Sequence, residues 1–137
     1  MDRVPIGDGL IYQAKLDGWR CVLDCVSGRV WSRHGKDLTR AFADLSADAR
    51  RVPACVLDCE VVAALHTGEV SFTRPQSRAG RGPRPGEDFD VHAVVLDLLA
   101  VGEVDWRGRR YHERRARWWS CWTAGLRGSG RCRRPRT

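Results

Sequence analysis

Lys15 is the side chain in this sequence best suited to nucleophilic chemistry. It follows an apolar run at residues 10–14 and begins the segment KLDGWR. Only two of the 24 basic side chains are lysines, Lys15 and Lys36; the others are arginines. An amine can lose its proton and attack an electrophile, whereas a guanidinium stays protonated. The presence of a lysine at this position in an arginine-rich chain therefore indicates that the function of the site requires an amine.

Two carboxylates, Asp58 and Glu60, lie inside an otherwise apolar segment, residues 54–65 (ACVLDCEVVAAL). Side chains two residues apart on a strand share one face of the sheet. A charge inside an apolar strand costs free energy unless it serves a partner or ligand. The pair therefore predicts a face of the sheet that binds a ligand or partner. The alternative is an edge strand with one solvent-exposed face.

The elements that must position these groups form a strand-rich pattern. We expect strands at residues 10–15, 19–26, 29–33, 54–65 and 89–100, and a turn at residues 27–28. Residues 40–51 predict an amphipathic helix, with Phe42, Leu45 and Ala49 facing inward and Pro53 after its end. The arginine-, glycine- and proline-rich residues 78–87 are expected to form a flexible basic loop. The pattern predicts several strands and one helix.

Composition narrows the class of protein. The chain has 137 residues, which fits one small domain or part of a larger one, and a net charge of +7, which favours a polyanionic partner. The chain has no apolar run of about 18 residues, so we expect no membrane span. Its N-terminus lacks the apolar stretch of a signal peptide, so we predict a cytoplasmic protein.

Two Cys-x3-Cys pairs allow a zinc site. Both pairs lie in apolar, strand-like segments, where cysteine is more typical as a small buried hydrophobic residue.

Four segments together resemble a known family. KLDGWR resembles the KxDGxR motif of ATP-dependent DNA ligases and of their capping-enzyme and RNA-ligase relatives. SRHGKDLT (residues 32–39), LDCE (57–60) and VVLDLL (94–99) follow in the order of the family's SRxGxxxT, LDGE and FDxL segments. DWRG and YHERR (105–108 and 111–115) resemble the DLRxxPYxERR stretch of bacterial ligases. Cys59 replaces a glycine and Leu96 replaces an aromatic residue of these motifs.

The resemblance implies a reaction and its parts. Lys15 would attack the α-phosphorus of ATP to form lysyl-AMP, with Mg²⁺ as the metal, and the chain would seal nicked double-stranded DNA in repair or recombination, beside other DNA-repair proteins. The implied nucleotide-binding residues are Asp17, Arg20, Arg33, Glu60 and Leu96. Arg33, Arg114 and Arg115 would contact DNA. The alternatives for Arg114 and Arg115 are ion pairs that stabilise the fold, or a solvated helix face. No residue of this chain is assigned as a metal ligand.

The resemblance also implies the architecture. We expect an α+β fold of antiparallel-rich sheets with flanking helices, forming part of an ATP-grasp-like ligase nucleotidyltransferase domain over residues 1–117. Residues 118–137 are expected to be a basic tail, disordered or out of frame, because WWSCW is unlike a helix of this family. The later EGxxxK and KxK segments and the OB-fold domain are not found in the sequence. Two alternatives follow: an inactive remnant that binds nucleotide or DNA weakly, and an RNA ligase or capping-type nucleotidyltransferase. The YHERR stretch favours DNA ligase over the latter.

Overall fold

The computed structural model describes residues 17–125, with side chains up to residue 119. The predicted strand at residues 10–15 and the nucleophile Lys15 lie outside this range. In chain order the elements are β1 (Trp19–Asp24), β2 (Val30–Ser32), α1 (Ala43–Ala49), β3 (Cys55–Leu65), β4 (Val70–Ser71), the 3₁₀ helix η1 (Arg74–Arg78), β5 (Phe89–Val101), β6 (Val104–Asp105) and α2 (Tyr111–Gly125).

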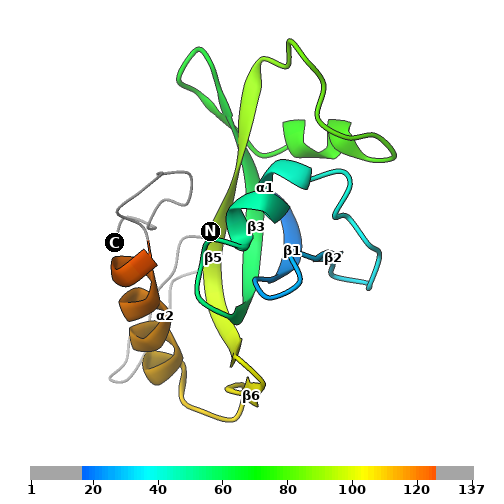
Figure 1. Ribbon diagram of the computed structural model, residues 1–137. Helices are drawn as coiled ribbons and strands as arrows, with labels where there is room; N and C mark the ends of the chain where they lie inside the picture. Colours follow the sequence, from blue (N-terminus) through cyan, green and yellow to red (C-terminus); the bar gives the residue numbers. More distant parts are fainter. Residues whose placement is uncertain (1–16, 126–137) are drawn as a thin grey trace, which may run out of the picture.

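Within residues 17–125, the strands form one antiparallel sheet. Its order is β2-β1-β3-β5-β6, and β4 adds to the far end of β3. Figure 1 shows β3 and β5 as the long central pair, with α1 in front of the strands and α2 beside β5. The predicted α+β class, with an antiparallel-rich sheet and flanking helices, is confirmed.

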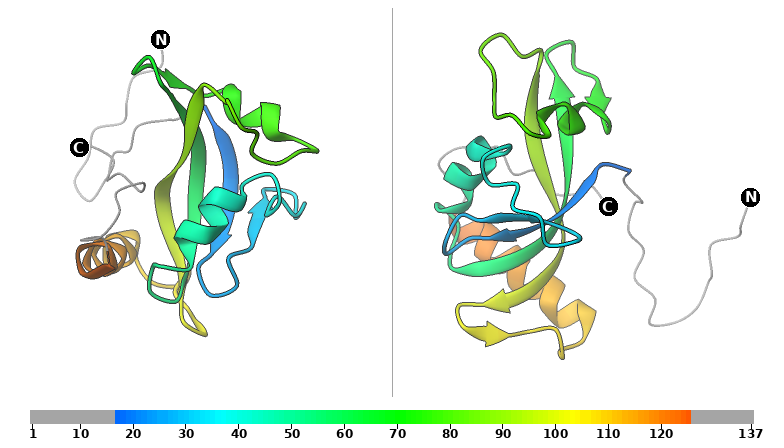
Figure 2. Two further views of the ribbon diagram at one scale, coloured as in Figure 1. Left: turned by 45° about the horizontal axis from the view of Figure 1, so that its top comes forward. Right: turned by 90° about the vertical axis from the view of Figure 1, so that its right-hand side faces the viewer.

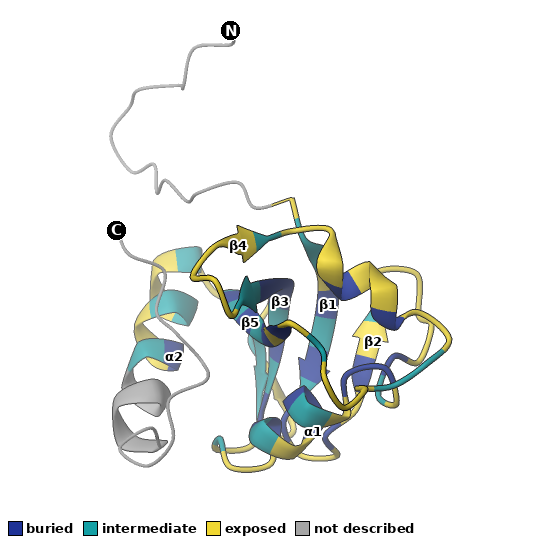
Figure 3. Cartoon of the chain, turned by 90° about the horizontal axis from the view of Figure 1, so that it is seen from above, coloured by how far each residue is buried: buried dark blue, intermediate teal, exposed yellow. Residues whose placement is uncertain are grey.

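The core lies between the sheet and α1. Because side chains alternate along a strand, one face of β1 and β3 carries the buried residues, among them Cys21, Leu23 and Cys59. Phe42, 0% exposed, anchors the start of α1 and meets Trp19 edge-to-face at 5.5 Å. Figure 3 shows the buried residues gathered on the central strands and the inner side of α1, with β4 and the loops exposed. The observed helix is shorter than the predicted 40–51, since residues 39–42 form turns.

Arg78 is buried and connects distant segments of the chain, whereas the sequence predicted that a flexible loop starts there. Its side chain is 3% exposed and forms ion pairs with Asp44 of α1 at 2.9 Å and with Glu87 at 3.1 Å. It also donates to the Ala41 carbonyl at 3.1 Å and lies over the Phe89 ring. The prediction of a flexible basic loop is therefore wrong at Arg78, because two carboxylates and a carbonyl compensate the cost of burying its charge.

Helix α2 crosses the boundary predicted at residue 117. It continues to Gly125, and Trp118 is 3% exposed in the buried cluster and stacked on Trp119 at 5.1 Å. The two views in Figure 2 place α2 along β5, on a different side of the strands from α1. Residues 118–125 thus continue a helix where an irregular tail was expected, while the division of the chain and its frameshift origin stay predictions. Neither helix in residues 17–125 is long and apolar enough to span a bilayer.

Candidate functional site

A charged corner lies where β1 and β3 pair, on the face of the sheet away from α1. It consists of Arg20, Asp58 and Glu60. Arg20 of β1 is directly opposite Glu60 of β3, and Val22 is opposite Asp58. Arg20 binds Asp58 through two hydrogen bonds, from Nε to Oδ1 at 2.6 Å and from Nη2 to Oδ2 at 2.5 Å. Such a bidentate pair fixes the plane of the guanidinium. The predicted shared face of Asp58 and Glu60 is thus present, and Arg20 binds Asp58 while it lies across the strand pairing from Glu60.

Glu60 is the buried acid of this corner. The residue is 7% exposed, and its Oε2 has no hydrogen-bond partner in the described part of the chain. Burial raises the pKa of Glu60, whereas the charge of Arg20 and a hydrogen bond from the Gly18 amide lower it. A buried acceptor atom without a partner costs free energy unless a ligand supplies the donor. Glu60 Oε2 is therefore suited to accept a hydrogen bond from a ligand hydroxyl.

Replacing Glu60 by glutamine is expected to change how stability depends on pH. The pKa of Glu60 is raised in the folded state above its ordinary value of 4.5. The folded chain thus holds this proton more tightly than the unfolded chain does, so the wild type loses this contribution to stability as the pH rises through the folded-state pKa. Glutamine does not titrate. We expect the stability of Glu60→Gln relative to the wild type to increase between about pH 4 and about pH 7.

Urea unfolding of both proteins at the two pH values measures this difference. Glu69→Gln, which changes an exposed carboxylate, gives the background. A relative stability of Glu60→Gln that stays constant or falls as the pH rises would contradict the assignment of a buried, desolvated acid at residue 60.

Gly18 permits the close approach of the chain to β3 beside Glu60. A Cβ atom at this position would lie 2.4 Å from the Val61 carbonyl oxygen and 3.2 Å from Glu60 Oε2. A contact of 2.4 Å with backbone cannot be relieved by a side-chain rotation, so the segment entering β1 would have to move away from β3. The glycine in KLDGWR is therefore required by packing in this corner.

Gly18→Ala is expected to destabilise the fold by about 1–3 kcal/mol, the usual cost of overpacking. Gly108→Ala is the matched control, because a Cβ atom there meets nothing within 4 Å. Chemical unfolding of the two variants measures the difference. Equal stability of the two variants would show that residue 18 is not packed against β3.

Leu96 lies close to the corner in a distorted part of β5. Val94 is opposite Glu60, and the β3–β5 register shifts between Asp58 and Cys59, so Leu96 is an extra residue on β5. Such a β-bulge bends the strand and turns its side chains. The Leu96 carbonyl accepts a hydrogen bond from the Tyr111 hydroxyl at 3.1 Å, which ties the bulge to α2.

Two other predicted nucleotide-binding residues, Asp17 and Arg33, are at the same end of the sheet as this corner. Asp17 is exposed, and its charge contributes to raising the pKa of Glu60. Arg33 is exposed and follows Ser32, the last residue of β2, which pairs with Cys21. Arg33 is therefore at the same end of the sheet as Arg20 and Glu60. Lys15 precedes Asp17 by two residues and lies outside the described range.

Arg114 has a structural role in α2. Its guanidinium binds the Asp97 carboxylate of β5 through Nε at 2.8 Å and Nη2 at 2.9 Å, donates to the Arg109 carbonyl, and lies 5.4 Å from the Tyr111 ring centre. Arg114 thus holds α2 against β5, which is the ion-pair alternative stated for it. Arg115 is on the same helix and half-buried. DNA contact by either residue stays a prediction.

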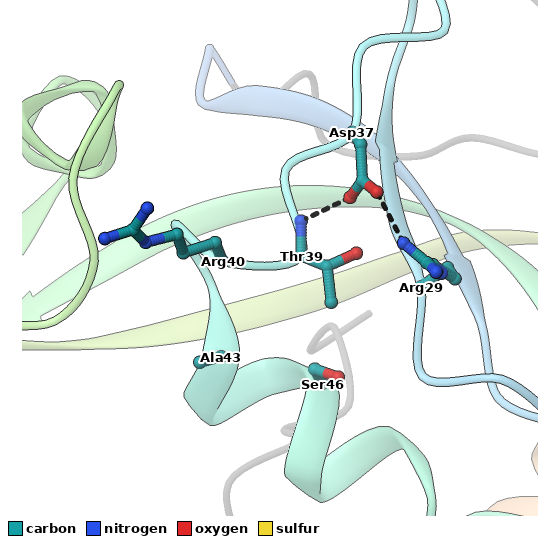
Figure 4. A pocket seen from close by; sticks show the side chains of 6 residues that line it. All are labelled: Arg29, Asp37, Thr39, Arg40, Ala43 and Ser46. Atoms are coloured by element: carbon teal, nitrogen blue, oxygen red, sulfur yellow. Dashed lines mark hydrogen bonds and ion pairs between the residues drawn. The ribbon is translucent and has the colours of Figure 1, made fainter.

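A separate pocket of about 420 Å³ lies between α1 and the segment around β2 (Figure 4). Its lining consists of Arg29, Asp37, Thr39, Arg40, Ala43 and Ser46. Asp37 accepts hydrogen bonds from the Thr39 amide at 2.9 Å and from Arg29 at 2.7 Å, and Arg40 extends away from this pair. The pocket contains none of the predicted site residues.

The cysteines of the two Cys-x3-Cys pairs are buried in the core. Across the residues with described side chains, no three His, Cys, Asp or Glu groups are placed to hold a metal ion.

Two features of the corner were not assigned a role from the sequence. The sequence predicts only that Asp58 shares a face with Glu60, and it predicts no packing contact for Gly18. Asp58 and Glu60 are two residues apart, and Arg20 is on a neighbouring strand. These two facts could have predicted the Arg20–Asp58 ion pair. The approach of Gly18 to the Val61 carbonyl depends on strand register, which the sequence did not specify.

Solved structures of known proteins share the fold of this chain. The ligase domain of LigD from Mycobacterium tuberculosis matches with a TM-score of 0.67 at 28% identity, over 89% of this chain and 37% of that one. A mycobacterial DNA ligase D complexed with ATP and MES matches with a TM-score of 0.69 at 29% identity, over 90% of this chain and 38% of that one. The fold is therefore that of the ligase nucleotidyltransferase domain.

Sequence comparison identifies the family. The model of the ATP-dependent DNA ligase domain matches residues 4–120, and the chain belongs to the ATP-dependent DNA ligase family. DNA ligase C2 of Mycolicibacterium smegmatis is 34% identical over 119 residues, 81% of this chain and 33% of the relative. DNA ligase C of M. tuberculosis is 34% identical over 113 residues, 77% of this chain and 31% of the relative. The chain thus spans about a third of the length of these curated relatives.

Proposed function

We propose that the chain supplies the nucleotide-binding part of an ATP-dependent DNA ligase, in which Lys15 carries AMP. The observation that supports this most is the unpartnered, buried Oε2 of Glu60, directly across the β1–β3 pairing from Arg20. These two side chains occupy the expected positions of the LDGE and KxDGxR motifs. A mycobacterial DNA ligase D of the same fold is known in complex with ATP, which supports ATP as the nucleotide.

The proposed reaction has three steps. The neutral amine of Lys15 attacks the α-phosphorus of ATP, a nitrogen–phosphorus bond forms, pyrophosphate leaves and the amine loses a proton. An oxygen of the 5′-phosphate at a DNA nick then attacks the phosphorus of lysyl-AMP, the nitrogen–phosphorus bond breaks, and the Lys15 amine takes up a proton as it leaves. The 3′-hydroxyl of the adjoining strand attacks that phosphate and displaces AMP, which seals the nick.

In this proposal each residue near the corner contacts a different part of the nucleotide. Glu60 Oε2 accepts a hydrogen bond from a ribose hydroxyl, and Arg20, held by Asp58, positions the nucleotide. Arg33 brings a positive charge to the nucleotide or DNA phosphates. Leu96 covers the adenine without an aromatic ring, so the base loses a stacking contribution on the order of 1 kcal/mol.

Mg²⁺ is implied by the family resemblance alone. Among residues with described side chains, no three His, Cys, Asp or Glu groups are placed to hold a metal ion. These residues therefore do not form a metal site by themselves. No step above is assigned to the metal, and Mg²⁺ stays a prediction for the complete enzyme.

The second candidate function is weak binding of nucleotide or DNA without formation of a covalent adduct. The chain spans about a third of the length of its curated relatives. An RNA ligase or capping-type enzyme is less well supported, because both curated relatives are DNA ligases. Nicked DNA is therefore the proposed substrate of the complete protein.

Labelling with ATP radioactive at the α-phosphate distinguishes the candidates. The isolated chain is compared with a chimera in which residues 4–120 replace the matching segment of DNA ligase C2 of M. smegmatis. After incubation with Mg²⁺, denaturing electrophoresis detects any covalent AMP. A labelled chimera with an unlabelled isolated chain supports a competent nucleotide-binding part that needs the rest of the enzyme. A folded, monodisperse chimera that stays unlabelled, while DNA ligase C2 itself is labelled, would contradict the proposal.

A further inference from the structure

Two cysteines face each other where β1 and β3 begin to separate. Cys25 follows the last residue of β1, and Cys55 is the first residue of β3. The pairing of Asp24 with Val56 and the hydrogen bond from the Cys25 amide to the Cys55 carbonyl, 2.8 Å, place them opposite one another. Both residues are buried, at 3% and 2% exposure, and their side chains are hydrogen-bonded to each other.

A second pair, Cys21 and Cys59, lies four residues further along the same two strands. These residues are also directly opposite each other and buried. Cys59 is paired on its other side with Val95 of β5, so this pair is enclosed in the middle of the sheet. Burial raises the pKa of Cys21 to about 12, whereas the hydrogen bond from Cys25 lowers the pKa of Cys55. The two pairs therefore differ in thiol reactivity, which depends on the thiolate form.

We propose that Cys25 and Cys55 are a redox-active dithiol that closes to a disulfide under oxidation. Directly opposed residues in an antiparallel pair have Cα atoms about 4.5–5.5 Å apart, within the 4.4–6.8 Å range that disulfides adopt. The contact between the two side chains places the sulfur atoms as neighbours. The position beside the turn at residues 25–27 allows local opening without disruption of the sheet centre.

Hydrogen peroxide is a small oxidant that can reach a buried pair during such opening. The Cys55 thiolate attacks one peroxide oxygen, the oxygen–oxygen bond breaks, and Cys55 becomes a sulfenic acid as hydroxide takes up a proton to form water. The Cys25 thiolate then attacks the Cys55 sulfur, a sulfur–sulfur bond forms and a second water leaves. In total two thiols and one hydrogen peroxide give one disulfide and two waters.

The disulfide would connect the strands that carry the charged corner. It would close the loop between residues 25 and 55, which contains β2, Arg33 and α1. It would also fix the β1–β3 register that places Arg20 opposite Glu60. The inference rests on strand pairing and burial, and does not depend on the proposed ligase function.

Peptide mapping of the wild-type chain tests the pairing directly. The folded chain is treated with a small molar excess of hydrogen peroxide, quenched with catalase, and blocked with N-ethylmaleimide in acidic guanidinium. Cleavage after arginine and before aspartate separates all four cysteines, because Asp24 and Asp58 lie between the members of each Cys-x3-Cys pair. The expected product is residues 24–29 linked to residues 52–57, and reduction should separate the two peptides.

The competing link gives the internal control. In the folded chain we expect the 25–55 link to exceed the link between residues 21–23 and 58–78 by about tenfold or more, since only the first pair lies at a strand end. Oxidation in guanidinium should remove this preference. A folded chain that forms the 21–59 link equally well, that links mainly through Cys121 or Cys132, or that keeps Cys25 and Cys55 as thiols would overturn the proposal.

Discussion

Replacing Lys15 by alanine in the chimera is expected to reduce covalent AMP labelling to the level of a sample without enzyme. Alanine has no nucleophile, so no nitrogen–phosphorus bond can form. Lys15→Arg is expected to fail equally, because a guanidinium does not lose its proton near neutral pH. Nucleotide binding should largely persist in Lys15→Ala, since Glu60, Arg20 and Arg33 remain in place. Electrophoresis after denaturation measures the label, and equilibrium dialysis measures the bound ATP.

Lys36 is the matched control, because it is the only other lysine between residues 1 and 137. It lies in the exposed loop after β2, and its amide donates to the Ser32 hydroxyl. Lys36→Ala should keep the label. Loss of the label in Lys36→Ala together with its retention in Lys15→Ala would place the nucleophile outside KLDGWR and remove the basis of the proposed mechanism.

Replacing Arg78 by alanine is expected to cause the largest loss of stability, about 3–5 kcal/mol, because it removes the buried member of two ion pairs. Glu87 then keeps its longer ion pair with Arg81, at 3.5 Å, and a hydrogen bond from the Arg84 amide. Glu87, whose side chain is 10% exposed, loses its ion pair with Arg78, and Asp44 loses two hydrogen bonds. The Ala41 carbonyl loses its donor as well. A small domain is stable by only about 5–15 kcal/mol, so this loss is a large fraction of the total. The midpoint of urea unfolding, followed by tryptophan fluorescence, measures it.

Arg74→Ala serves as the comparison, because Arg74 is in the same 3₁₀ helix and also binds a carboxylate. Its pair with Asp88 at 3.1 Å is exposed, with side-chain exposures of 49% and 56%, so its removal should cost only about 0–1 kcal/mol. Arg78→Lys should fall between the two variants, since lysine keeps the charge but lacks the two-pronged geometry. Similar losses for Arg74→Ala and Arg78→Ala would show that burial does not set the importance of Arg78.

The longer strands β1, β3 and β5 were predictable because their patterns are local, whereas the two-residue strands β4 and β6 were not predicted. Alternating side chains defined β1, and the long apolar segments defined β3 and β5, with ends within one residue of those observed for β3 and β5. The spacing of Asp58 and Glu60 predicted their shared face for the same reason. The family resemblance added the proposed roles of Lys15, Arg20 and Glu60, which no pattern of apolar residues could supply.

The features that were missed depend on contacts between distant segments. Arg78 is in a polar, glycine-rich sequence, and nothing local indicates that Asp44 and Glu87 compensate its burial. The bulge at Leu96 follows from the register between β3 and β5, which single-strand patterns do not specify. Trp118 belongs to a segment with an unusual run of tryptophans, yet it is buried where α2 meets the core.

A crystal structure of the chimera with bound ATP tests the central claim most directly, because it shows whether the nucleotide lies at the charged corner or in the pocket between α1 and the segment around β2. The account predicts a ribose hydroxyl within hydrogen-bonding distance of Glu60 Oε2, beside Arg20, with the Lys15 amine facing the α-phosphorus. ATP bound instead in the pocket of Arg29, Arg40 and Ser46, with Glu60 Oε2 and the Lys15 amine away from the nucleotide, would contradict it.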